Sequence, residues 1–218
     1  MINTFQGSQC AQSIDRADFK VAARGERMQS PASRAKANAS DEALIVAIGR
    51  GDRHAMAMLY QRHRVGIYRF ALRIVGNATL ADDILSDVFL EVWRRANRFK
   101  AKACVSTWLL AIARNMSLSV VRRRDVEHVD CESIELEDPT PNPEIMVCKG
   151  DRVEVVRRCL SELSPAQREV VDLVYYHEKS IAEVAEIVGA PANTVKTRMF
   201  HARRRLALSL AAAGYDGF

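Results

Sequence analysis

Apolar residues recur at intervals of three and four along most of this 218-residue chain, beginning near position 41. This is the spacing of one face of an α-helix, and no segment shows the strict alternation that predicts a β-strand. In the first half, the pattern predicts helices over 41–48, 53–75, 79–96 and 107–123. Gly49 and Gly76 follow the first two helices, as expected at helix ends. The pattern therefore predicts an all-α first domain over 41–124.

The expected start and core of this domain follow from the same spacing. Asp41 and Glu42 are placed to cap the first helix, because acidic side chains favour a helix N-terminus. The expected core includes Leu44, Val46, Ile48, Leu59, Ile67, Phe70, Ile84, Val88 and Val92.

Helical spacing resumes after position 150 and predicts a second, smaller domain over 151–210. A helix over 153–163 is followed by one that Ser164 caps, with Pro165 at the tolerated first position. Ser180 and Glu183 form a capping box that begins a short helix, and Gly189 ends it. A basic helix over 192–206 comes next. This order is typical of a helix-turn-helix, here in a four-helix, winged-helix-like domain that places its last helix in the DNA major groove.

The basic helix has two different faces. Val195, Met199, Ala202 and Leu206 recur at helical spacing and are expected to be buried. The residues predicted to contact DNA are Thr194, Lys196, Thr197, Arg198, Phe200, His201, Arg203 and Arg204. Lys196, Thr197, Phe200 and His201 form a stripe that can face base edges, whereas the arginines are better placed for phosphates. A core position is the alternative for Phe200.

Segments outside the two domains lack helical periodicity. Residues 1–40 are polar and predict a flexible N-terminal extension, either a plain tail or a regulatory arm. Residues 125–150 are rich in acids and contain Pro139, Pro141 and Pro143, which predicts an extended acidic linker. About 25 residues can reach on the order of 80 Å, so the domains need not touch. Residues 211–218 are expected to form a fraying tail.

Composition narrows the function classes. The net charge of +5 and a pI near 9.1 indicate a polyanionic partner. Five cysteines without a C-x-x-C pair favour free thiols in a reducing cytoplasm. His128, Cys131 and Cys148 are the alternative, a zinc site, but their spacing is irregular, so neither metal nor cofactor is expected. No apolar run suggests membrane insertion or a signal peptide.

Four segments together resemble the extracytoplasmic-function group of bacterial sigma-70-type RNA polymerase sigma factors. Two lie in the first domain, at 81–93 (ADDILSDVFLEVW) and at 107–115 (TWLLAIARN) with the arginines 122–124. The other two lie in the second domain, at 163–168 (LSPAQR) and 194–198 (TVKTR). The resemblance extends over about 41–208.

The resemblance implies a role for each segment. Asp83, Ser86, Asp87, Leu90 and Glu91 would bind the clamp helices of the β′ subunit of core RNA polymerase. Asp83 and Asp87 are four residues apart, so they project from one side of a helix; an ordinary solvated face is the alternative. Phe99, Lys100, Lys102, Trp108, Asn115, Arg122 and Arg123 would melt and read the −10 element.

Strand opening requires a place for an unstacked base. The irregular segment 99–106, packed on the helix with Trp108 and Asn115, is the expected pocket, and the Asn115 amide can read a base edge. A core position is the alternative for Trp108 and Trp93.

The sequence thus predicts an alternative sigma factor, with core RNA polymerase (β and β′ subunits) and promoter DNA as partners. The resemblance also implies a cognate anti-sigma factor, and an acidic linker that runs toward the RNA exit path. A two-domain helix-turn-helix regulator that acts without polymerase is the alternative. An enzyme is not expected, because the chain has no catalytic constellation.

Overall fold

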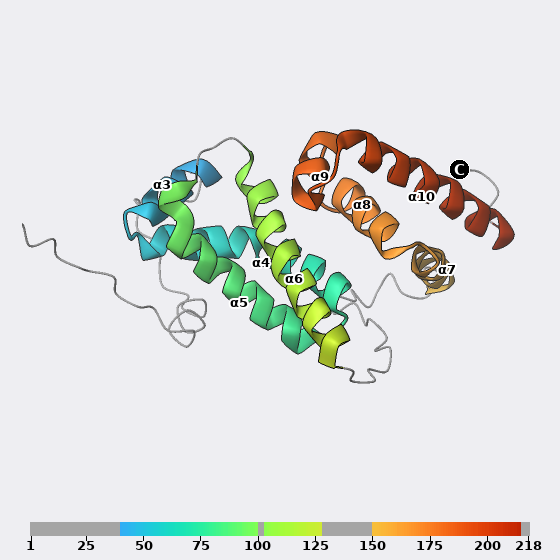
Figure 1. Ribbon diagram of the computed structural model, residues 1–218, viewed down its shortest axis with the longest axis horizontal. Helices are drawn as coiled ribbons and strands as arrows, with labels where there is room; N and C mark the ends of the chain where they lie inside the picture. Colours follow the sequence, from blue (N-terminus) through green and yellow to red (C-terminus); the bar gives the residue numbers. More distant parts are fainter. Residues whose placement is uncertain (1–39, 100–102, 128–149, 215–218) are drawn as a thin grey trace, which may run out of the picture.

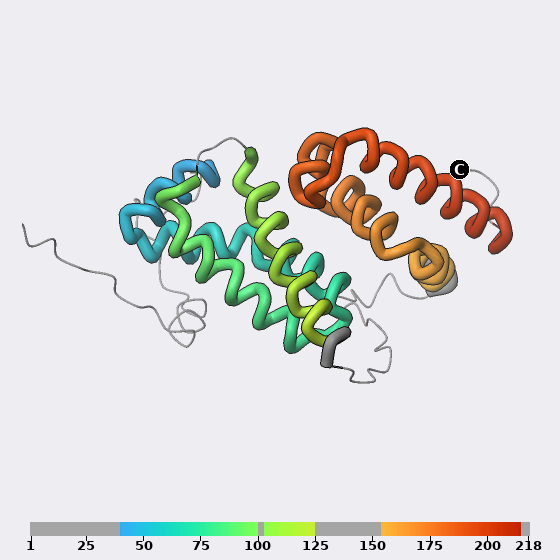
Figure 2. The backbone as a smooth tube through the Cα atoms, in the orientation of Figure 1, coloured from blue at the N-terminus to red at the C-terminus, as the bar shows by residue number. Residues whose placement is uncertain are grey.

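The computed structural model describes residues 40–99, 103–127 and 150–214, and these contain helices and no strand. In chain order the elements are α3 (Asp41–Gly49), α4 (Arg53–Val75), α5 (Ala78–Arg95), the 3-10 turn η1 (Ala96–Arg98), α6 (Val105–Glu127), α7 (Gly150–Ser161), α8 (Pro165–Tyr175), α9 (Ile181–Val188) and α10 (Ala192–Ala212). Figure 1 shows them in two groups, α3–α6 and α7–α10, and Figure 2 follows the same path as one tube. The all-α, two-domain prediction is confirmed.

The first domain begins with side-chain caps on three helices. Ser40, Asp52 and Asn77 each accept hydrogen bonds from backbone N–H groups of the following first turn. Gly76 ends α4 with φ 66°, a left-handed conformation that glycine adopts without a steric penalty. The first helix is therefore capped by Ser40, and the expectation that Asp41 caps it was wrong.

α4, α5 and α6 pack against one another, and α3 covers one end of α4. Fully buried side chains on these helices include Ile45, Leu59, Phe70, Val88, Phe89, Val92 and Leu109. One expected core residue was wrong: Val46 is 54% exposed, while its neighbour Ile45 is buried. Adjacent residues of a helix point about 100° apart, so a small error in the predicted buried face replaces Ile45 by Val46. A helix of nine residues has too few apolar positions for the sequence to define that face accurately.

In the second domain, α10 packs on α7, α8 and α9. Both predicted capping boxes are present, Ser164 with Gln167 and Ser180 with Glu183. Gly189 ends α9 at φ 62°, and Pro191 then precedes α10. The helix-turn-helix is confirmed in the geometry that the sequence predicted.

Two helices extend past their expected ends. α6 begins at Val105 and continues to Glu127, and α10 continues to Ala212, into the expected tail. Most of the predicted linker and N-terminal extension, with Lys100, Lys102, His128, Cys131 and Cys148, lies outside the described residues.

The two domains pack against each other, although the linker would allow them to separate. α9 lies against α6, side by side in Figure 1. No helix in the described parts of the chain is long and apolar enough to cross a membrane.

Candidate nucleic-acid interface

α10 presents an exposed polar stripe over a buried apolar row. Val195, Met199 and Ala202 are buried, and these residues hold the helix on its domain. Among the residues predicted to contact DNA, Lys196, Thr197, Phe200, His201, Arg203 and Arg204 are exposed, and Thr194 and Arg198 are half-buried. Phe200 is 62% exposed, which excludes the alternative that it is a core residue.

A tyrosine that the sequence analysis missed lies beside the basic stripe. Arg203 donates a hydrogen bond from Nε to the Tyr175 hydroxyl oxygen at 3.1 Å, and its guanidinium carbon is 5.8 Å from the ring centroid. Tyr175 ends α8 and is 60% exposed. The Tyr175 side chain therefore restricts the direction in which the Arg203 guanidinium projects.

The predicted polymerase-docking residues share one face of α5. Asp83, Ser86, Asp87, Leu90 and Glu91 are all partly exposed. The opposite face, with Ile84, Leu85 and Val88, is buried in the core of the first domain. Glu91 pairs with Arg95 one turn later, and the Ser86 hydroxyl donates to the Asp82 carbonyl oxygen at 3.0 Å. The face is acidic and accessible, as a basic partner helix would require.

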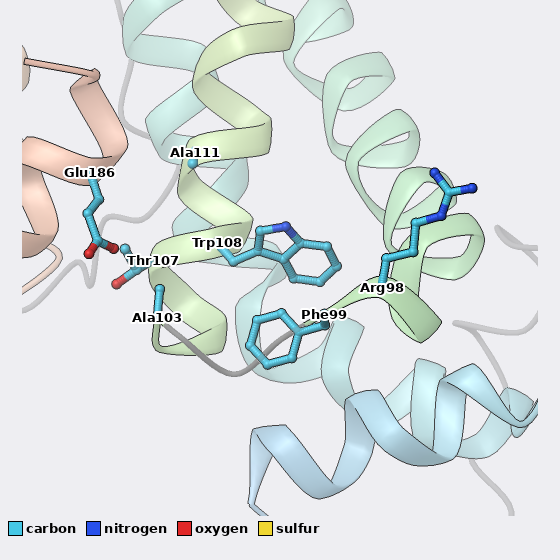
Figure 3. Close-up of a pocket in the computed structure, with 7 residues that line it drawn as sticks. All are labelled: Arg98, Phe99, Ala103, Thr107, Trp108, Ala111 and Glu186. Carbon is cyan, nitrogen blue, oxygen red and sulfur yellow. The ribbon is translucent and has the colours of Figure 1, made fainter.

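A cavity of about 250 Å³ opens where the segment before α6 meets that helix. It is lined by Arg98, Phe99, Ala103, Thr107, Trp108, Ala111 and Glu186. The rings of Phe99 and Trp108 lie together in Figure 3, with centroids 5.1 Å apart and an interplanar angle of 43°. Phe99 and Trp108 are both partly exposed, so Trp108 combines packing on the core with a place in the cavity wall. Trp93 is also partly buried and packs against the core.

Asn115, Arg122 and Arg123 are exposed on α6 but are not among the residues that line this cavity. Asn115 is seven residues, or about two turns, beyond Trp108. In the described part of the chain, this cavity therefore brings together Phe99 and Trp108, and Asn115 lies on another part of α6. Asn115 and the two arginines form a separate, exposed part of the same helix.

Polar contacts join the cavity side of the first domain to the second domain. Thr107, which is 2% exposed, donates from Oγ1 to Glu183 Oε1 at 2.8 Å. The backbone N–H of Ser180, together with the Thr107 and Ser180 hydroxyls and Lys179, lowers the pKa of Glu183 to about 2. Glu183 is thus a firmly ionised carboxylate that caps α9 and contacts α6 at the same time.

An exposed basic helix in a helix-turn-helix, carried by a two-domain all-α chain, defines a DNA-binding protein of the transcription machinery. Comparison with known families agrees: residues 59–126 match the family description "Sigma-70 region 2", and residues 154–206 match "Sigma-70, region 4".

Two curated relatives are similar over most of their length. The chain is 34% identical over 168 residues to the ECF RNA polymerase sigma factor SigM of Mycobacterium tuberculosis (strain ATCC 25618 / H37Rv), covering 77% of this chain and 83% of the relative. It is 30% identical over 175 residues to the ECF RNA polymerase sigma factor SigK of Mycobacterium ulcerans (strain Agy99), covering 75% and 90%.

Solved structures share the fold. CnrH, solved in complex with the cytosolic domain of CnrY, superposes with a TM-score of 0.59 at 23% identity, covering 80% of this chain and 99% of that one. The sigma factor RpoE from Bartonella quintana, solved in complex with the anti-sigma factor NepR, gives a TM-score of 0.56 at 25% identity, covering 69% and 95%.

The chain belongs to the ECF family of RNA polymerase sigma factors. Its function is that of an alternative sigma factor, and proteins of this class are in general not catalytic enzymes.

Proposed function

We propose that the first domain, 41–124, acts as sigma region 2 and that the second, 151–210, acts as sigma region 4. The exposed stripe on α10 carries this proposal: Lys196, Thr197, Phe200 and His201 are accessible on a helix whose other face is buried. Lysine donates to guanine acceptors, and threonine and phenylalanine contact a thymine methyl. The stripe reads the −35 element, and Arg198, Arg203 and Arg204 hold phosphates.

The acidic face of α5 docks on the β′ subunit of core RNA polymerase, and α6 with its preceding cavity opens and reads the −10 element. The Phe99–Trp108 cavity offers aromatic surface to an unstacked base, and such stacking contributes about 1–3 kcal/mol per base. Asn115, Arg122 and Arg123 continue the surface along α6. The chain itself catalyses no step; it positions the polymerase.

A cognate anti-sigma factor is a further partner, since RpoE of Bartonella quintana was solved in complex with one. The site of action is the cytoplasm, because promoter DNA and core polymerase meet there. We expect the chain to require no cofactor for this function.

Charge reversal on α5 tests the docking assignment. Asp83→Lys combined with Asp87→Lys should abolish binding to core polymerase, measured by size-exclusion chromatography and by core-dependent transcription from genomic fragments, while the helical circular dichroism is kept. The matched control is Glu42→Lys with Glu154→Lys, two exposed sites with the same charge change. Normal assembly of the α5 variant would refute the assignment. Tight duplex binding by the free chain, equal to that of the holoenzyme, would favour a polymerase-independent regulator.

A further inference from the structure

Two neighbouring tyrosines at the end of α8 have different partners. Tyr176 lies toward the first domain, where its hydroxyl oxygen accepts a hydrogen bond from Arg69 Nη1 at 2.6 Å. Tyr175 lies toward α10, where its hydroxyl oxygen accepts from Arg203 Nε at 3.1 Å. α8 and α10 pack against each other within the second domain (Figure 1). Of the two tyrosines, Tyr175 is therefore the one that contacts the basic helix.

Arg203 belongs to the row of α10 that is expected to face DNA. It follows Lys196 by seven residues and Phe200 by three, and both spacings return to the same side of a helix. All three side chains are exposed. Seven residues correspond to about 10 Å along the helix axis. The first turns of a recognition helix contact base edges, so a side chain two turns further along meets the sugar-phosphate backbone.

The group that holds Arg203 is neutral. Elsewhere in the chain, Glu169 holds Arg114, and a carboxylate of this kind fixes a guanidinium but also cancels its charge. Within the described residues Arg203 has no carboxylate partner. Tyr175 holds it by the hydrogen bond to Nε and by its ring, whose centroid is 5.8 Å from the guanidinium carbon. The direction of Arg203 is thus restricted while its positive charge stays available to an anion.

The donors that this contact leaves over suit a phosphate group. Arg203 uses Nε for Tyr175, so the N–H groups on both Nη atoms remain. The Tyr175 hydroxyl accepts from Nε and keeps its own O–H for donation. Because the hydroxyl oxygen lies 3.1 Å from Nε, one anionic oxygen can reach the hydroxyl and an Nη group at hydrogen-bond distance. Both side chains are exposed, so this oxygen can approach from solvent.

We propose that Tyr175 and Arg203 together form a binding site for one phosphate of the DNA backbone at the −35 element. Tyr175 positions the guanidinium, and its own hydroxyl donates to the same phosphate. This inference rests on the proposed function of α10. Because the two side chains come from α8 and α10, the bound phosphate fixes the whole second domain on the duplex. It thereby sets the register in which Lys196 and Phe200 meet base edges.

The hydroxyl can be removed without a change in charge. Tyr175→Phe keeps the ring beside Arg203 but loses the acceptor for Nε and the donor to the phosphate. Holoenzyme formed with core polymerase is titrated into a fluorescein-labelled duplex that wild type has selected from a randomised pool, and binding is followed by anisotropy. We expect about a tenfold loss of affinity, the size associated with a hydrogen bond to a charged group. The salt dependence should stay that of wild type, because no cation is lost.

Three further variants calibrate this loss. Arg203→Ala removes the cation of the site and should reduce the salt dependence of the binding constant by about one phosphate contact. Arg205→Ala removes the same charge from an exposed residue that lies about 200° further around the helix. Tyr176→Phe removes the neighbouring hydroxyl, which contacts the first domain. Arg205→Ala and Tyr176→Phe are the matched controls and should bind the duplex as wild type does.

A neutral linkage in the DNA distinguishes a phosphate contact from support of the fold. Each phosphate of the −35 segment is replaced in turn by a methylphosphonate, which removes its charge. At one position wild type should lose about tenfold in affinity. At that position Tyr175→Phe and Arg203→Ala should lose little more than they have already lost on unmodified DNA, because the contact is already broken. A residue that only stabilises the fold gives the same penalty at every position.

Two results would overturn the inference: a Tyr175→Phe holoenzyme that binds unmodified duplex as tightly as wild type, or a Tyr175→Phe penalty that is equal at all methylphosphonate positions. In both cases, an Arg203→Ala penalty that is confined to one phosphate would show that only the role of Tyr175 is wrong. A different result tests the proposed function. If wild-type holoenzyme selects no −35 sequence and neither Lys196→Ala nor Arg203→Ala changes binding, the assignment of α10 fails, and the inference fails with it.

Discussion

Acidification should protonate His177 and thereby separate the two domains, so that the chain passes from a closed to an open state. This imidazole is packed between the domains, and its side chain is 8% exposed. Burial, together with the positive charges of Arg73 and Lys179, lowers its pKa from 6.5 to about 4. Asp172 is the opposing group, with Oδ2 at 3.7 Å from Nε2, and the Tyr176 ring completes the surroundings. In the closed chain, His177 is therefore neutral at pH 7.

The size of the effect follows from linkage between protonation and closure. When the domains separate, His177 becomes hydrated and its pKa returns to about 6.5, so the open state binds the proton more readily. Because the pKa of His177 is lower in the closed state, this residue stabilises the closed state above pH 6.5. Its contribution to the free energy of closure is lost as the pH falls toward 4. Between pH 7 and pH 5 the loss is about 2 kcal/mol, or about a 20-fold rise in the ratio of open to closed chains.

Energy transfer between dyes on unnatural amino acids at Val46 and Leu208, which are 54% and 65% exposed, measures the ratio of open to closed chains directly. Circular dichroism at both pH values checks that the helices persist. His177→Gln is the matched control, because glutamine keeps a polar side chain but does not titrate in this range. Its energy transfer should change little between pH 7 and pH 5. An equal opening of wild type and His177→Gln would refute the reasoning. So would a proton NMR titration that gives His177 an ordinary pKa in the closed chain.

Two further outcomes are expected. Lys196→Ala should relax the −35 sequence preference, whereas Arg203→Ala should weaken binding to all sequences and reduce the salt dependence of the binding constant by about one phosphate contact. A binding-site selection combined with a salt series distinguishes the two variants. Identical behaviour would contradict the assignment of base-reading and phosphate-binding residues on α10. Glu183→Gln should lower the free energy of unfolding at pH 7, because the folded carboxyl has its pKa near 2 instead of 4.5. We expect a loss of about 2 kcal/mol, which is less than the full pKa difference implies, because the partly exposed carboxylate is screened by solvent. That difference should shrink as the pH falls from 4.5 toward 2, in urea melts of both proteins.

Local signals were enough to predict the elements. The spacing of apolar residues located every helix of the described chain to within a few residues, because amphipathic faces and capping residues act over one or two turns. Ser180 with Glu183, followed by Gly189, placed the helix-turn-helix correctly. The faces of α10 also followed, since Val195, Met199 and Ala202 are all buried. The buried face was assigned incorrectly at Val46, which lies in the short helix α3.

The contact between the domains could not be predicted, because it joins residues that are far apart in sequence. Arg114 and Glu169 are separated by 55 positions, and Arg69 and Tyr176 by 107. Neither the spacing of apolar residues nor a short sequence motif indicates which distant residues form such pairs. Two local irregularities did point to them: Gly66 in the middle of a long helix, and Asp172 within the apolar run of α8. An acid that is 8% exposed on an apolar face requires a partner from elsewhere.

The chemistry of this contact also bears on how easily the chain opens. Several of its side-chain pairs are charged or hydroxyl-bearing: Arg73 with Asp172, Arg114 with Glu169, and Thr107 with Glu183. Separating an apolar interface exposes hydrocarbon to water, whereas separating these pairs returns each charge to hydration, so the net cost per pair is small. Domain contacts of this polar kind are characteristic of surfaces that separate during function. These polar pairs therefore allow the two domains to separate at a modest cost in free energy.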